Sequence, residues 1–235
     1  WELNTNLTTP SWTVISGANA ATYDSGALTT TTQFRRTTIS TLNSVACESA
    51  PTSVVTVTVQ DTVTSGAIAA DQTICNGGDP VAFTSTTAGS GSTGATISYR
   101  WELNTNLTTP SWTVISGANA ATYDSGALTT TTQFRRTTIS TLNSVACESA
   151  PTSVVTVTVQ DTVTSGAIAA DQTICNGGDP VAFTSTTSGS GSTGATISYR
   201  WELNTNLTTP SWTVISGANA ATYDSGALTL SLIHI

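Results

Sequence analysis

Apolar and polar residues alternate in several short segments of the chain. Residues 97–103 carry an apolar side chain at every second position, including Trp101 and Leu103, and polar residues stand between them. In residues 154–159 valine alternates with threonine. A period of two predicts β-strands that bury one face, so Trp101 and the valines of the second segment are expected in the core.

Further strands are expected between segments rich in glycine, asparagine and serine, which favour turns. A first strand is expected at residues 66–68 and is continued by 73–75, and the others are expected at 81–85, 111–116, 121–123 and 133–139. Residues 1–100 contain 23 Thr and 12 Ser. Threonine suits pleated surfaces better than helices, and no segment favours a helix, so the sequence predicts an all-β fold.

The chain is an internal repeat with a period of 100 residues. Residues 101–200 repeat residues 1–100 with one change, Ala88 against Ser188, and residues 201–229 repeat 101–129. A period of this size is typical of a self-sufficient domain rather than of a solenoid unit. We expect the C-terminal part of one module at 1–61, a complete module at 62–161 and the N-terminal part of a third at 162–229. The linker at about 161–165 is short, which predicts a semi-rigid rod.

The last six residues leave the repeat. Residues 230–235 read LSLIHI, where the repeat would continue as TTTQF. The string CTG TCT CTT ATA CAC ATC, the end of a transposase-based sequencing adapter, would encode these residues. We therefore interpret 230–235 as read-through from a metagenomic library, and a genuine apolar strand is the alternative. The chain begins within a strand pattern, so we expect it to be part of a longer protein.

Composition excludes several function classes. The chain has six Arg, no Lys and a formal net charge of −8, which argues against nucleic acid as a partner because neutralising phosphates needs clustered cations. No run of 18 apolar residues is present, so no membrane span is expected.

The sequence offers no catalytic set. The single histidine, His234, lies in the suspected artefact, so histidine-dependent catalysis is not expected. The carboxylates are dispersed and no His/Cys cluster has metal-ligand spacing, so we expect no enzyme, no metal site and no cofactor. The alternative left open is a calcium site at a module junction, using Asp61 with Asp71 or Asp79.

The order of motifs in one period resembles a known module type. The motifs are residues 71–78 (DQTICNGG), 97–101 (ISYRW), 111–118 (SWTVISGA) and 134–136 (FRR), followed by Cys147 and the Val/Thr strand. They resemble the Ig-like (PKD-like) modules repeated in very large surface proteins of Bacteroidetes-type bacteria, including adhesins associated with gliding motility. The resemblance implies tandem Ig-like β-sandwiches, secretion and display at the cell surface. Phe134 departs from the pattern, because a tyrosine is common there.

Two cysteines per module indicate disulfides in an exported array. Cys75 with Cys147, inside one module, is the first choice, with the partners of Cys47 and Cys175 outside the chain. A strictly Ig-like topology would instead place Cys75 and Cys147 at opposite poles. A link between modules or between chains would then be favoured, because a disulfide needs Cα atoms within about 7 Å.

Trp112 is the candidate ligand contact. Exposed indoles stack on sugars, so Trp112 could bind surface glycans, whereas core packing is the alternative. Arg135 and Arg136 point to opposite faces of their strand, and one of them is expected to lie over a tryptophan as a cation–π contact.

These observations predict a structural segment of a long extracellular fibre, stalk or filament that supports adhesion. Its expected partners are neighbouring modules of the same chain and identical chains in a filament, since Val/Thr edge strands can pair laterally. Two alternatives stay open: tandem glycan-binding modules, and spacer domains of a secreted enzyme.

Overall fold

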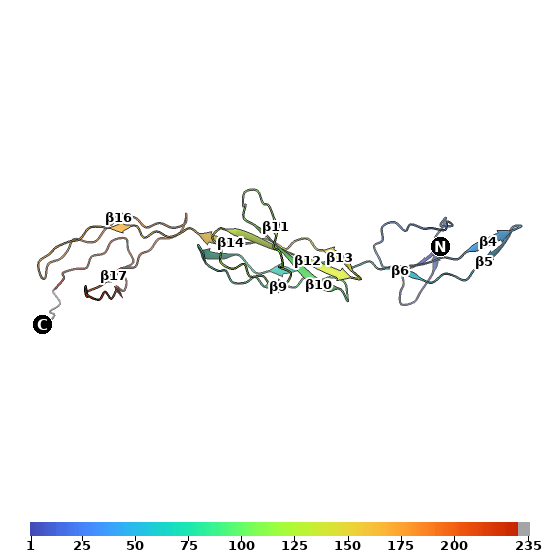
Figure 1. Cartoon of the computed structure of the whole chain (residues 1–235), viewed down its shortest axis with the longest axis horizontal. Coiled ribbons are helices and arrows are strands. Elements are labelled where there is room, and N and C mark those ends of the chain that lie inside the picture. The colour runs from blue at the N-terminus through green and yellow to red at the C-terminus, as the bar shows by residue number, and fades with distance from the viewer. Residues whose placement is uncertain (230–235) are drawn as a thin grey trace.

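The computed structural model describes residues 1–229, and the suspected read-through at 230–235 lies outside the described residues. The chain forms a row of three parts (Figure 1). We call residues 1–61, 62–161 and 162–229 the first, second and third repeats. The described residues contain strands and no helix, which confirms the predicted all-β fold. It follows that none of these residues lies in a helix able to cross a membrane.

Each repeat contributes its own strands. The first repeat contains β1 (Glu2–Asn4), β2 (Thr13–Val14), β3 (Thr32–Arg35), β4 (Ile39–Leu42), β5 (Val45–Glu48) and β6 (Val55–Val57). The second contains β7 (Ala67–Ile68), β8 (Gln72–Cys75), β9 (Ser85–Thr87), β10 (Thr96–Asn104), β11 (Thr113–Val114), β12 (Thr132–Leu142), β13 (Val145–Glu148) and β14 (Val155–Gln160). The third contains β15 (Ala167–Ile168), β16 (Ser185–Thr187), β17 (Glu202–Leu203) and β18 (Thr213–Val214).

One large sheet organises the second repeat. Its strand order is β11-β10-β12-β14-β8, and β13 also pairs with β12. The long strands β10 and β12 are antiparallel, with a register that runs from Thr96 opposite Thr141 to Asn104 opposite Gln133. The edge strand β8 is parallel to β14. A separate pair, β7 with β9, contributes two more strands.

The core of the second repeat is aromatic. Trp101, Phe134, Val155 and Val157 come from the large sheet, and Phe83 comes from the segment before β9. Trp101 and Phe83 are fully buried, and their ring centroids lie 5.9 Å apart. Aromatic pairs at this separation stabilise a core beyond their buried area, by about 1 kcal/mol each. The prediction that Trp101 belongs to the core is confirmed.

Identical sequences in the first and second repeats differ in burial. Val155 is 4% exposed, whereas its counterpart Val55 is 62% exposed. The core cluster that contains Val155 also contains Phe83, and Ile74 packs against this cluster; the first repeat has no counterpart of the segments that carry Phe83 and Ile74. Strand β12 is likewise continuous, whereas the same sequence forms the separate strands β3 and β4. A counterpart of residues 62–95 is therefore needed to complete the core.

Several strands differ from those expected. The strand expected at 111–116 is reduced to β11, and 66–68 and 73–75 correspond to β7 and β8 in different sheets rather than to one continued strand. The strand expected at 81–85 starts only at Ser85, because Phe83 makes an isolated bridge to Tyr123. Residues 121–123 contribute only that bridge. Strand β13 was not predicted, since its residues VACE show no alternation of apolar and polar positions.

Candidate functional site

The junction between the first and second repeats is a direct contact. The side chain of Gln60 follows β6, and its Nε2 donates a hydrogen bond to the Val145 carbonyl at 2.8 Å. The Ser140 hydroxyl donates to Gln60 Oε1 at 3.4 Å. The turn between β12 and β13 therefore reaches back to the end of the preceding repeat.

A groove of about 280 Å³ lies at this junction. It is lined from the first repeat by Thr56, Thr58 and Gln60, and from the second repeat by the β12–β13 hairpin, including Cys147. Cys147 lies opposite Ser140 in the hairpin register. Opposed residues in a strand pair point to the same face of the sheet, so the side chains of Cys147 and Ser140 lie on the same face. This is the face on which Ser140 contacts Gln60.

The other end of the second repeat carries Cys75. This residue lies opposite Gln160 in the parallel pair β14–β8. Cys75 and Gln160 line a second groove with residues 161–163, which lead into the third repeat. Cys75 therefore faces the following repeat, just as Cys147 faces the preceding one.

The four cysteines are free thiols in this structure. By the register of the sheet, Cys147 and Cys75 are about eleven residue positions apart along the strand direction. At about 3.3 Å per residue, this is a distance of about 35 Å. A disulfide requires Cα atoms within about 7 Å. The structure therefore does not bring the first-choice pair Cys75–Cys147 together.

A buried arginine connects β12 of the second repeat to the segments around Ser65, Ser85 and Ala121. Arg136 is fully buried, and its guanidinium donates to the Ala121 carbonyl at 2.7 Å, to the Ser65 carbonyl at 3.3 Å and to the Ser85 hydroxyl. Burial lowers the pKa of Arg136, while Tyr99 acts in the opposite direction. Among the described residues no carboxylate forms an ion pair with Arg136. Carbonyl oxygens and aromatic faces solvate this cation instead.

Trp112 belongs to a stack on the opposite face. The guanidinium of Arg135 lies 4.1 Å from the centroid of the Trp112 ring. Arg135 is held in turn by Glu102, with 2.6 Å between Nε and Oε2. Both arginines therefore make cation–π contacts, since Arg136 also lies 5.7 Å from the centroid of the Trp101 ring. Sequence reasoning expected such a contact for one of them.

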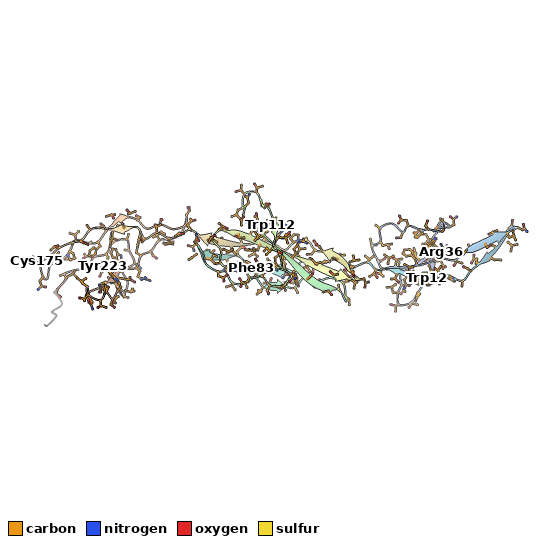
Figure 2. All side chains as sticks on the ribbon, viewed as in Figure 1. Trp12, Arg36, Phe83, Trp112, Cys175 and Tyr223 are labelled. Atoms are coloured by element: carbon orange, nitrogen blue, oxygen red, sulfur yellow. The ribbon has the colours of Figure 1, made fainter. Side chains whose placement is uncertain are left out.

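The exposure of Trp112 depends on this stack. Trp112 is half-buried. Trp212, whose repeat ends before an equivalent of Arg135 is reached, is 66% exposed. Figure 2 labels Trp112 beside the loop that projects from the row, close to β11. The ring is neither a core residue nor a free platform.

Several carboxylates are engaged in structural contacts. Asp71 accepts a hydrogen bond from the Thr156 backbone N–H at 2.8 Å, which links β14 to the start of β8. Arg100 donates to Glu148 at 2.6 Å, and this bond raises the pKa of Arg100. Within residues 1–229 no three His, Cys, Asp or Glu side chains are grouped so that they could hold a metal ion. Asp61, Asp71 and Asp79 therefore do not form such a group in the described part of the chain.

Sequence reasoning missed Gln60 and the burial of Arg136. An isolated glutamine at the end of a Val/Thr strand carries no recognisable motif, so no signal pointed to it. For Arg136 a signal was available: it lies two residues after Phe134 on the same strand, so its side chain points to the same face as the core residue Phe134. An arginine on the inward face of a strand should have been assigned to the core with Phe134.

Comparison with known proteins gives a family and no function. No curated protein and no solved structure matches the chain. One family model, described as a domain of unknown function (DUF8696), matches residues 1–61, 64–161 and 164–233. These three matches span nearly the whole chain, and each corresponds to one repeat. The chain therefore belongs to the DUF8696 family, whose model it matches in three successive segments.

Proposed function

We propose that the chain is a structural segment of a long extracellular surface fibre, stalk or filament that supports adhesion. Each module of about 100 residues is an Ig-like β-sandwich joined end to end with the next. Its work is reach and mechanical cohesion, and binding to a target is supplied elsewhere or by many weak contacts along the array.

The packing of the second repeat supports the sandwich. The core covers one face of the large sheet, and the segment carrying Phe83 and the β7–β9 pair lies against it. Arg136 joins the two, because it extends from β12 in the large sheet to Ser65 and Ser85, which belong to the other layer. Two strand layers around a single core are the architecture of a β-sandwich.

The junction is the observation that carries the proposal. One complete repeat lies in a row between two partial copies of the same sequence (Figure 1), and Gln60 binds the next repeat directly through Val145 and Ser140. A short linker and a hydrogen-bonded contact both restrict bending. A repeated, oriented contact of this kind suits a chain whose purpose is length.

Immuno-electron microscopy on intact cells of the source organism tests this proposal. An antibody against residues 62–161 is expected to decorate thin surface fibres with an axial repeat of about 35–40 Å, from strands of about 3.3 Å per residue plus loops. The same antibody pre-adsorbed with the purified chain is the control. Labelling only after permeabilisation, or labelling without fibres, would contradict the proposal.

A second candidate function is glycan binding along the array. It is favoured by the half-buried Trp112 ring stacked on Arg135. Weak sites repeated along a fibre would gain from avidity. If it is correct, Trp112→Ala with Trp12→Ala abolishes binding to a glycan array while the far-ultraviolet circular dichroism spectrum is unchanged. Binding that survives both substitutions would eliminate this candidate.

A further inference from the structure

The second repeat carries one cysteine at each end, and the single cysteines of the first and third repeats lie at the matching ends of those repeats. Cys47, in the β4–β5 hairpin, belongs to the outer end of the first repeat (Figure 1). Cys175 lies at the opposite outer end, in the third repeat (Figure 2). In the second repeat Cys147 faces the preceding repeat and Cys75 faces the following one. In an uninterrupted array each junction would therefore be flanked by one hairpin cysteine and one strand-end cysteine, whereas the first junction here carries only Cys147 and the second only Cys75.

Gln60 places the hairpin cysteine at the first junction. Its amide is hydrogen-bonded to Val145 and Ser140, and Ser140 lies opposite Cys147. Gln60 and Cys147 also line the same groove. The thiol of Cys147 is thus on the side of the hairpin that meets the end of the preceding repeat.

Gln160 places the strand-end cysteine at the second junction. It occupies the position equivalent to Gln60, and Cys75 lies directly opposite it in the neighbouring strand. Neighbouring strands are about 4.8 Å apart, and opposed residues point to the same face. The strand ends are built alike in the two repeats: Val59 N–H donates to Thr31 Oγ1 and Val159 N–H to Thr131 Oγ1, both at 3.0 Å.

The glutamine at the end of the last strand of a repeat lies next to both kinds of cysteine: Gln60 next to Cys147, and Gln160 next to Cys75. Because the repeats share one sequence, a complete junction places the glutamine between the strand-end cysteine of its own repeat and the hairpin cysteine of the next. We propose that these two thiols form a disulfide, so that each junction of the array is covalently stapled. The partners are the cysteine equivalent to Cys75 in one repeat and the cysteine equivalent to Cys147 in the following repeat.

This pairing explains why the four thiols are free. The partner of Cys75 would lie 100 residues after Cys147, and the partner of Cys147 would lie 100 residues before Cys75, both outside the 235 residues. Cys47 and Cys175 likewise lack their partners. The free thiols are thus a consequence of the pairing rule, since no junction in this chain carries both of its cysteines.

The reaction is an ordinary thiol–disulfide exchange with a disulfide oxidant. One cysteine thiolate attacks the oxidant and forms a mixed disulfide, and half of the oxidant leaves as a thiol. The second cysteine thiolate then attacks the mixed disulfide, and the other half leaves as a thiol. The two cysteines are oxidised, the oxidant is reduced, and the two protons end on its thiol products. The inference depends on the proposed function in one respect: the extracellular location provides the oxidising compartment in which a disulfide persists.

The test uses two chains that differ in one junction. The chain as it stands lacks the partner of Cys75. A longer chain, continued from Thr229 with the sequence of residues 130–161, supplies that partner. Both are folded, treated with oxidised glutathione and measured by intact mass after reaction of the remaining thiols with an alkylating agent. The longer chain is expected to lose two hydrogens and keep all but two of its cysteines reactive, whereas the shorter chain forms no internal disulfide.

Serine variants assign the bond, because peptides from different repeats share their sequence. In the longer chain Cys75→Ser should abolish the disulfide, while Cys147→Ser and Cys175→Ser should leave it intact. A disulfide that disappears with Cys147→Ser, or one that forms in the shorter chain, would show the intramodule pair and overturn the proposal. A longer chain that circular dichroism shows to be folded, but that forms only mixed disulfides with glutathione, would also overturn the proposal. None of these results depends on where the protein is displayed, so the proposed function can fail separately.

Discussion

The guanidinium of Arg136 lies over the ring of Tyr99, 4.3 Å from its centroid, in the interior of the second repeat. Its hydrogen bonds to Ser65 and Ala121 connect three separate segments of that repeat. In the first repeat the equivalent Arg36 is only half-buried, and its guanidinium donates to the Ala21 carbonyl and makes no counterpart of the Arg136 hydrogen bonds to Ser65 and Ser85. The chain thus contains the same arginine in a complete and in an incomplete environment.

Replacing these two arginines separates the contribution of the core from that of the local sequence. Arg136→Ala leaves buried carbonyls without donors, so we expect the free energy of unfolding of the second repeat to fall by about 3 kcal/mol or more. Arg36→Ala should cost about 1 kcal/mol or less. Urea unfolding followed by tryptophan fluorescence measures both. Equal losses of unfolding free energy in the two variants would show that the contacts of Arg136 with the segments of Ser65, Ser85 and Ala121 do not stabilise the second repeat.

Tyr123 makes the second repeat sensitive to alkaline pH. Burial raises its pKa above the ordinary value of about 10, and the nearby Asp124 adds to the shift. The unfolded chain therefore releases the phenolic proton at lower pH than the folded one. The contribution to stability is complete below about pH 10 and is lost as the pH rises through the folded pKa. Tyr123→Phe should flatten this fall in urea-unfolding midpoints between pH 9 and 11, and an unchanged slope would contradict the assignment.

The sequence predicted strands well where alternation extended over six or more residues. Residues 97–103 and 154–159 lie within or almost within β10 and β14, because long alternating runs leave one register that buries the apolar face. Prediction failed around Phe83, where a buried aromatic makes a single bridge instead of a ladder. At such a position tertiary packing decides the conformation, and a local pattern cannot report it.

The candidate sites divide in the same way. The position of Trp101 followed from the alternation of its own strand. The position of Cys75 depends on the parallel pairing of β8 with β14, and that of Cys147 depends on the β12–β13 hairpin. The local sequence of these segments does not predict either pairing. Gln60 was unpredictable for a stronger reason: its partners lie in the next repeat, 80 and 85 residues away.

Trypsin should distinguish two bonds with identical flanking sequence. Arg100 lies in β10, its side chain is 31% exposed, and it is hydrogen-bonded to Glu148. Arg200 precedes the same residues, but its side chain is 71% exposed and it lies outside any strand. Cleavage requires local opening, which costs little outside a sheet. Limited digestion should therefore cut after Arg200 well before Arg100, and mass spectrometry resolves the products by length. Early cleavage after Arg100 would contradict the compact second repeat.

Gln60 and Gln160 offer a matched pair for the stiffness of the junction. Gln60→Ala removes two hydrogen bonds between repeats, about 1 kcal/mol in total because they lie near solvent. Such a change shifts a docking equilibrium about fivefold, so small-angle X-ray scattering should report a broader range of particle dimensions. Gln160→Ala should leave the profile unchanged, because the chain does not contain the hairpin that would meet it. Identical profiles for all three chains would assign the stiffness to the linker alone.

Gly91 tests the contact that holds the β12–β13 hairpin in place beneath the junction. A Cβ at this position would collide with the side chain of Ser140, which is fully buried and belongs to the same strand as Arg136. In the third repeat a Cβ on the equivalent Gly191 would meet Ile197 at 3.3 Å and Val163 at 3.8 Å, with no collision. Overpacking a closed site costs about 1–3 kcal/mol, so Gly91→Ala should lower the unfolding midpoint while Gly191→Ala changes it little. Because Ser140 also donates to Gln60, Gly91→Ala should in addition loosen the junction in the scattering profile. A variant that loses neither stability nor stiffness would show that Ser140 can move freely, and the contact between repeats would then not depend on a fixed hairpin.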